Sequence, residues 1–492
     1  MRTIRRPIKL KLFFLLLTVL MLFVFACGGG SGDGDDERYP PSQMPTNFEM
    51  THERVLGEDE YNGLLEPQIQ AEVDEDGIIH IVFYSASPSY PVELLPAGHD
   101  LIANPFRYQI HHIQFNANQA DPDLSGNEDI VTVTPPHDGD DEPLPDDAGI
   151  DNCMLLGLAI SNGNTPVVVY QGGNRPGSDG GLACNGFYQG DLMVNVRSGN
   201  GWQEYLGIQG DASVKNPLFT DGMAGMAGDV AVDSAGNIHM VVQHYYEWCD
   251  LHSTSFPDLL YVRQSPSDLG QYSTAMEEWV DEHNVYGGGG GIQNASGYFC
   301  KIILDGDEQP AVFYYATMVD GTRQIRVSRL TETGWTANTV YLVPPEYTVT
   351  AVSPAVAGDG TLGVAYNLKM ISENADYLDH LCYAQLQEDG HWLNTVVDYH
   401  SFCGRACVLS FDNHSRPAIV YYDEKPFTDY RERKDVKFAY FNGEQWRNET
   451  AANEGDIGLY NALWFDGENL AHICTYMQDM HKVMVFRRMV PN

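Results

Sequence analysis

One short phrase recurs seven times along this chain and restricts it to a repeat architecture. Each copy has a tight turn rich in Asp and Gly, followed by an apolar strand that ends on Tyr or another large polar residue. The seven strands occupy residues 80–84, 166–170, 239–243, 310–314, 363–367, 417–421 and 472–476. Self-similarity of this kind indicates units that stack on one another to bury a shared core.

The spacing of the copies predicts the blades of a β-propeller. In the C-terminal half of the chain, successive copies begin about 50 residues apart, which is close to the length of a four-stranded blade. A third strand follows in each unit, then a Gly-containing turn and a fourth strand that often opens on tryptophan. We expect these tryptophans to pack between neighbouring blades; they are Trp202, Trp335, Trp392 and Trp446, with Trp279 fitting more loosely.

The seventh unit stops after its third strand, and an unpaired strand stands near the N-terminus at residues 47–56. Pairing the two would close the ring and remove its exposed edges. The sequence therefore predicts an all-β fold. The predicted architecture is a seven-bladed β-propeller of four-stranded antiparallel blades over residues 46–492, closed by the N-terminal strand.

Residues 1–26 have the features of a secretion signal. Five basic residues precede an apolar run of 15, from Leu12 to Ala26, which is short for a membrane span and typical of a signal-peptide core. Residues 24–27, Val-Phe-Ala-Cys, resemble a bacterial lipobox. That resemblance implies cleavage before Cys27, lipidation of its thiol and, with Gly28 next, the outer membrane of a Gram-negative cell envelope. A secretion signal with a coincidental cysteine is the alternative. Residues 27–45 begin with a Gly/Asp-rich stretch, predicted to be a flexible tether.

Charge and cysteine content fit an exported protein. Loss of the five basic residues of the signal changes the net charge from −40 to −45, which disfavours nucleic acid and anionic lipid headgroups as partners. Eight cysteines remain besides Cys27, an even number that suggests disulfides. The disulfide candidates are Cys153, Cys184, Cys249, Cys300, Cys403 and Cys407, whereas Cys382 and Cys474 are expected to be free core thiols.

The connections between strands divide into two classes of very different length. First-to-second strand turns are tight, whereas the connections at the opposite end of the blades hold nearly all extra residues. Six long segments occur in units one to four, at residues 85–105, 134–151, 171–190, 206–226, 244–257 and 281–296. Recognition usually depends on loops built out from one face of a rigid scaffold. We call this end of the blades the insertion face and expect it to bind the ligand.

The long loops of units two and three combine aromatic rings with polar groups. A flat apolar ring beside planar donors and acceptors suits a sugar, although the same aromatics would also serve to pack the loops. The predicted ligand-binding residues are Arg175, Tyr188, His244, Tyr245, Tyr246 and Trp248. The acidic residues in 138–151 make calcium a candidate ligand, without matching an EF-hand; no other cofactor is expected.

Over residues 47–492 the chain resembles the sialidase-like superfamily of bacterial propellers, in its repeated Asp/Gly turn before a strand and its Gly-then-Trp strand entry. The resemblance implies the architecture. The sialidase Asp-box, Ser-x-Asp-x-Gly-x-x-Trp, is nowhere complete, and the catalytic set of that family is not assignable.

Three functions remain open on the sequence alone. The first is a non-catalytic, lipid-anchored propeller that binds a glycan or an envelope protein. The second is a glycan-active hydrolase or lyase, which needs two carboxylates across a cleft or a His/Tyr/Arg set; its candidates are Asp229, His244, Glu247, Arg405 and Tyr460. The third is an assembly or scaffold lipoprotein of the envelope.

Overall fold

A computed structural model gives the fold of the chain. The chain divides into two compact units, Met1–Gln43 and Met44–Asn492, and every described residue belongs to the second. The structure describes residues 48–55, 69–86, 107–116, 128–131, 150–151, 154–172, 191–199, 201–208, 222–246, 257–267, 269, 276–280, 295–371, 378–399, 402–425, 433–453, 455–477 and 482–489.

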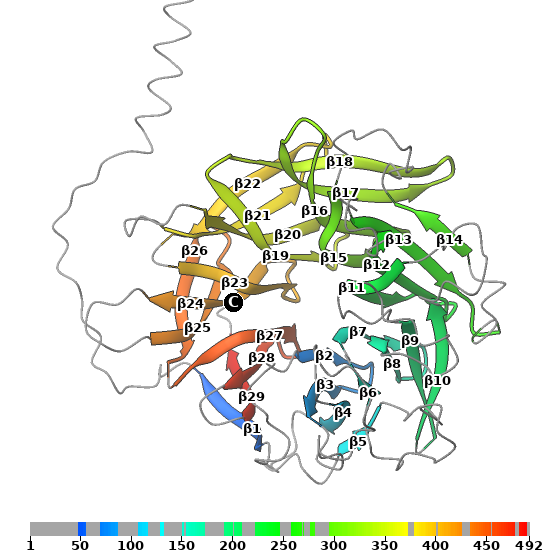
Figure 1. Cartoon of the computed structure of the whole chain (residues 1–492). Coiled ribbons are helices and arrows are strands. Elements are labelled where there is room, and N and C mark those ends of the chain that lie inside the picture. Colours follow the sequence, from blue (N-terminus) through cyan, green and yellow to red (C-terminus); the bar gives the residue numbers. More distant parts are fainter. Residues whose placement is uncertain are drawn as a thin grey trace, which may run out of the picture. The chain divides into compact units, whose positions relative to one another are not determined.

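Seven antiparallel sheets form the blades of a propeller (Figure 1). In chain order they contain the strands named here. Blade 1 has β2 (Ile69–Val73), β3 (Ile78–Ala86), β4 (Arg107–Asn116) and β5 (Glu128–Ile130), with β6 (Ile150–Asp151) added to β4. Blade 2 has β7 (Met154–Ser161), β8 (Thr165–Gly172), β9 (Asp191–Ser198) and β10 (Gly201–Ile208). Blade 3 has β11 (Gly222–Val232), β12 (Ile238–Tyr246), β13 (Pro257–Gln264) and β14 (Met276–Trp279).

The remaining blades follow the same order. Blade 4 has β15 (Ala295–Leu304), β16 (Pro310–Thr317), β17 (Arg323–Thr331) and β18 (Gly334–Val343). Blade 5 has β19 (Tyr347–Val356), β20 (Leu362–Met370), β21 (His380–Leu386) and β22 (Trp392–Asp398). Blade 6 has β23 (Phe402–Phe411), β24 (Pro417–Lys425), β25 (Arg433–Phe441) and β26 (Trp446–Ala452). Blade 7 has β27 (Ile457–Phe465), β28 (Leu470–Met477), β29 (Lys482–Met489) and β1 (Glu49–Val55).

The first strand of each blade is its innermost strand. Each inner strand contacts the next around the ring, and β27 contacts β2. The predicted pairing of the N-terminal strand is confirmed, because β1 runs antiparallel to β29 with Glu53 opposite Met484. The Thr51 hydroxyl donates to the carbonyl of Val485 at 3.2 Å, and Lys482 pairs with Glu53 at 2.9 Å. The last blade is thus built from both ends of the described chain.

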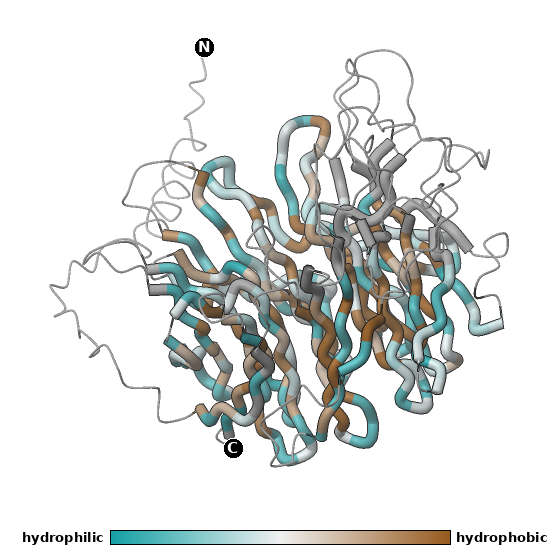
Figure 2. Tube along the Cα trace, turned by 60° about the horizontal axis from the view of Figure 1, so that its bottom comes forward, coloured by the Kyte–Doolittle hydropathy of each residue, from teal (hydrophilic) through white to brown (hydrophobic). Residues whose placement is uncertain are grey.

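The core lies between the blades, where the apolar residues of the second strands are buried from solvent. Val168, Val241 and Val312 are fully buried, and in Figure 2 apolar residues concentrate within the strands while many of the turns are polar. The predicted packing of tryptophans between blades is confirmed for Trp335, Trp392 and Trp446. Trp335 meets Tyr261 of blade 3 edge to face at 5.0 Å, and the same kind of contact joins Trp392 to Phe313 at 5.9 Å and Trp446 to Tyr383 at 5.4 Å.

One detail differs from the expected organisation. Several strands extend into segments that we expected to be loops, because backbone pairing continues there: β11 begins at Gly222 and β12 runs to Tyr246. The described residues contain no helix, and accordingly none that is long and apolar enough to span a membrane.

Candidate functional site

Of the residues predicted to bind a ligand, the structure describes the backbone of three, at the end of β12 in blade 3. Arg175, Tyr188, Glu247 and Trp248 fall outside the described residues. His244, Tyr245 and Tyr246 are the last residues of β12, where His244 pairs with Ala224 and Asp258 through the backbone; their side chains are not described. Acidic segment 138–151 is described only at its last two residues, so calcium stays a prediction.

The opposite end of the blades, which we call the turn face, is closed by short turns held by aspartate. In Asp233, for example, one carboxylate oxygen accepts the backbone N–H groups of Ala235 and Asn237 at 3.0 and 2.7 Å. The same bonding recurs in blades 1, 4, 6 and 7. The predicted tight turns are therefore present and rigidly capped.

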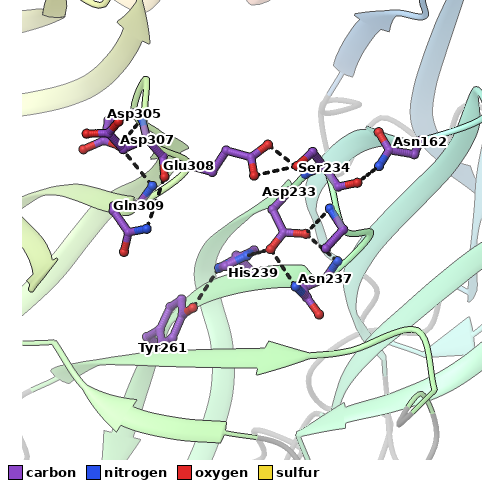
Figure 3. A network of polar contacts seen from close by, with 11 residues as sticks. Asn162, Asp233, Ser234, Asn237, His239, Tyr261, Asp305, Asp307, Glu308 and Gln309 are labelled. Atoms are coloured by element: carbon purple, nitrogen blue, oxygen red, sulfur yellow. Dashed lines mark hydrogen bonds and ion pairs between the residues drawn. The ribbon is translucent and has the colours of Figure 1, made fainter. Parts of the chain in front are cut away.

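Neighbouring turns are also bonded to one another. Ser234 of blade 3 donates its N–H and its hydroxyl to Glu308 of blade 4 at 2.9 and 2.6 Å, and Asn162 of blade 2 donates to the carbonyl of Ser234 (Figure 3). Similar bonds join blade 1 to blade 2 through Asn164, and blade 6 to blade 7 through Asn413. The first-to-second strand turns of neighbouring blades are thus cross-linked into a platform.

Blade 3 contains an Asp-His-Tyr arrangement that looks like a catalytic relay. His239 Nε2 lies 3.2 Å from Asp233 Oδ2, and its Nδ1 lies 2.7 Å from the hydroxyl of Tyr261 (Figure 3). Tyr261 is 0% exposed, so no substrate reaches its hydroxyl. Burial lowers the pKa of His239, which keeps the ring neutral. We conclude that this network stabilises the blade and is not catalytic.

Blade 1 contains a longer buried network. Arg197 donates to His112 Nδ1 at 2.9 Å, His112 Nε2 lies 3.0 Å from His80 Nδ1, and His80 Nε2 lies 3.3 Å from Asp74. Burial lowers the pKa of His112 and lowers that of His80 to about 4. His112 Nδ1 also lies 2.9 Å from Asp129 Oδ1, so this nitrogen either accepts from Arg197 or donates to Asp129, according to the tautomer. Asp129 balances the charge of Arg197 at 2.8 Å.

Asp229, a candidate catalytic residue, lies on inner strand β11 and is held by blade 4. Lys301 Nζ is 3.4 Å from Asp229 Oδ1, and the N–H of Ile302 donates to Oδ2 at 3.1 Å. Burial raises the pKa of Asp229. Ser353 accepts the N–H of Leu409 at 3.0 Å in the same way between blades 5 and 6. Asp229 therefore ties one inner strand to the next.

Glu72, which the sequence did not single out, approaches this pair from blade 1. Its side chain is exposed, but it lies on inner strand β2 among the surrounding blades. The protein around this strand raises the pKa of Glu72 even though its side chain reaches solvent, the charge of Asp229 raises it further, and Lys301 lowers it. Gly157 lies beside Asp229, since a Cβ there would stand 3.0 Å from its Oδ1. Shifted carboxylates of this kind mark candidate functional sites.

Arg405 lies on inner strand β23 in blade 6, away from the contacts of Asp229. Its guanidinium pairs with Glu424 at 3.3 Å and lies 5.8 Å from the centre of the Tyr422 ring. Tyr460, on β27, packs against the core between blades 7 and 1. The structure thus places Asp229, Arg405 and Tyr460 in three different blades with separate sets of partners.

The disulfide prediction is wrong for the three candidates that the structure describes. Cys300, Cys403 and Cys407 are free, buried thiols. Cys403 and Cys407 both lie on β23, and four steps along a strand span about 13 Å, well beyond the separation that a disulfide bridges. Cys382 and Cys474 are free and buried, as predicted. Cys153, Cys184, Cys249 and the lipidation candidate Cys27 lie outside the described residues.

Metal binding has no support from the described side chains. In the part of the chain that the structure describes, no group of three or more His, Cys, Asp or Glu residues is arranged to hold a metal ion.

Comparison with known proteins yields similarity in structure only. No protein-family model matches the chain, and no curated protein matches it in sequence. A protein of unknown function from Dyadobacter fermentans is 12% identical, with 80% of this chain and 99% of that one covered and a TM-score of 0.43. The Hadza microbial sialidase Hz136 is 12% identical, with 92% and 95% covered and a TM-score of 0.44. AofleA from Arthrobotrys oligospora is 8% identical, with 84% and 92% covered and a TM-score of 0.42.

Proposed function

We propose that this protein is a lipid-anchored, extracytoplasmic β-propeller that binds a glycan, without catalysis, through the insertion face of blades 1 to 3. The observation that carries the proposal is the difference between the two ends of the blades. At the turn face, only a tight turn such as residues 233–237 separates the first strand from the second. At the insertion face, the second and third strands of the first three blades are separated by the much longer segments 87–106, 173–190 and 247–256. A rigid platform with long loops on one side is the arrangement of a recognition scaffold.

Binding without turnover is favoured by what the described polar groups do. Asp229 is occupied in joining blades 3 and 4, and the Asp-His-Tyr arrangement of blade 3 is sealed from solvent. Arg405 belongs to a separate cluster in blade 6. The enzyme alternative requires either two carboxylates across a cleft or a His/Tyr/Arg set, and two of its candidates, Asp229 and Arg405, lie in different blades with different partners.

A glycan array tests the binding function. The chain from residue 40 onward is expected to bind at least one neutral glycan, and Trp248→Ala is expected to abolish that signal because it removes the largest aromatic surface of the blade 3 loop. Tyr399→Ala, which removes an exposed aromatic ring from blade 5, is the matched control. Parallel arrays with calcium and with a chelator would reveal a role for the acidic segment.

A blank array would overturn the proposal and redirect the search to an envelope protein, which crosslinking in cells would identify. Product release from a bound glycan would instead establish the hydrolase or lyase alternative.

The anchor is tested separately. Cys27→Ser is expected to move the protein from the membrane fraction to the soluble fraction and to remove labelling by an alkyne fatty acid, because the thiol is the predicted attachment point of the lipid. Ser31→Ala in the tether is the control. Cys27→Ser can remain in the membrane fraction if its signal segment stays uncleaved. Fatty-acid labelling of the wild-type protein is therefore measured in the same experiment, and absence of that label would refute lipidation.

A further inference from the structure

The outer strands of the seven blades differ in charge. Each outer strand leaves one edge of its sheet unpaired, and charged residues are a usual protection of such edges against other chains. Strands β1, β5, β10, β14 and β26 each contain at least one glutamate. Strand β18 contains no charged residue, and the only charge of β22 is its last residue, Asp398, which is 6% exposed. The edges of blades 4 and 5 therefore lack the protection that the other five have.

Strand β22 projects beyond the strands around it. Its four residues from Leu393 to Val396 are all exposed, and successive residues of a strand point to opposite faces of the sheet, so both faces of β22 reach solvent here. Leu393 is 57% exposed and Val396 is 49% exposed. Among the outer-strand side chains that the structure describes, no other run of four is exposed. The free edge ends at Val397, whose carbonyl accepts from Asn448 of blade 6 at 3.1 Å.

The uncharged edges of blades 4 and 5 lie next to each other. Strands β18 and β22 are in contact (Figure 1), and the amide of Asn394 donates to the carbonyl of Val340 at 3.3 Å. We call the exposed edges of these two strands the uncharged rim. A strand of another chain can approach β22 here without meeting a carboxylate of the neighbouring strand β18.

Charge indicates which partner suits this rim. A basic partner would be attracted to the edges that carry glutamate, and a neutral partner would not be repelled by them, so neither needs an uncharged edge. Only a strongly acidic partner is kept from the other five edges and admitted at this one. A second copy of the chain has that property, because its net charge is −40, and it presents the same uncharged strand.

We propose that two copies of this protein associate through β22, edge to edge and antiparallel about a two-fold axis. A two-fold axis brings the same strand of both copies together. Backbone hydrogen bonds across the axis then join two four-stranded blades into one continuous sheet, which removes both free edges. A contact centred on the short run from Leu393 to Val396 is small, so the expected dimer is weak and reversible.

Sedimentation velocity tests the dimer on the chain from residue 40 onward, which contains every described strand. Between about 2 and 200 μM, where a small interface is expected to dissociate, we expect a reversible change from monomer to dimer. Added salt is expected to strengthen the dimer, because it screens the repulsion between two acidic copies. Thr395→Lys is expected to weaken the dimer about tenfold or more, because lysine on an edge strand opposes pairing.

Met50→Lys is the matched control. It adds the same charge at an exposed position of β1, an outer strand that is already charged, and is expected to dimerise like the wild type. Lysine makes the net charge less negative, so general repulsion cannot explain a weaker dimer in Thr395→Lys. Hydrogen exchange on the wild type requires no variant: the amides of residues 393–396 are expected to exchange more slowly at about 200 μM than at about 2 μM.

Three results would overturn the proposal. One is a wild-type chain that stays monomeric over the whole range of concentration and salt. Another is dimerisation of Thr395→Lys with the affinity of the wild type. The third is a dimer that persists on dilution, which would indicate exchange of β1 between copies and not pairing of β22.

Discussion

Replacing Arg488 with alanine is expected to lower the free energy of unfolding by about 3–5 kcal/mol, the usual effect of breaking a buried ion pair. Arg488 is 5% exposed on β29 and bonds Glu449 of blade 6. Its guanidinium also lies 5.5 Å from the ring centre of Phe48 and 4.6 Å from that of Tyr440. The substitution leaves Glu449 without this partner and empties an aromatic enclosure that joins blade 6 to the residue before β1.

Arg487→Ala provides a matched control one residue earlier. Arg487 pairs with Glu49 at 2.8 Å across the same strands, but its side chain is 36% exposed and that of Glu49 is 67% exposed. Exposed pairs contribute at most about 1 kcal/mol. Urea unfolding of both variants at one pH compares the two contributions. If Arg488→Ala were no more destabilising than Arg487→Ala, the aromatic enclosure would have no special role in closing the propeller.

Acidification is expected to lower the free energy of unfolding by about 3 kcal/mol through His80 alone. The pKa of His80 is about 4 in the folded chain and about 6.5 in the unfolded chain. The folded state binds this proton less readily, so its stabilising effect is complete above pH 6.5 and declines as the pH falls to 4. Burial lowers the pKa of His112, His239 and His472 too, which adds to the loss.

His80→Ala should flatten this dependence on pH. Alanine occupies the equivalent position in blades 4 and 6, at Ala311 and Ala418, so the substitution is compatible with the repeat. Urea unfolding at intervals between pH 4 and 7.5 gives the profile, and His391→Ala at an exposed turn is expected to preserve the full acid loss. An unchanged slope in His80→Ala would show that the acid sensitivity arises elsewhere.

The fold was predictable because its determinants are local and repeated. Alternation within each strand, the Asp/Gly turns and the tryptophan entries all lie within a single repeat unit. Pairing of β1 with β29 followed from counting strands, although the bonded residues Thr51 and Val485 are far apart in the chain. The Asp-to-His spacing of six residues, shared by Asp74–His80, Asp233–His239 and Asp466–His472, was visible in the sequence and would have revealed part of the buried networks.

Contacts between blades were harder to foresee. Nothing local joins Arg197 to His112, 85 residues away, or Lys301 to Asp229, 72 residues away. The cysteine prediction failed because even cysteine number and proximity in the chain say nothing about strand geometry. The predicted binding loop remains a prediction.

Pairing of β1 with β29 also imposes an order on biogenesis. Synthesis produces β1 before β29, so β1 has no partner strand while the other six blades are made. During that interval β1 is an unpaired edge strand, and β29 of another copy of the chain can pair with it as readily as β29 of the same chain. Chains that fold at high concentration are therefore prone to exchange their first strands, and dilution would favour pairing within one chain.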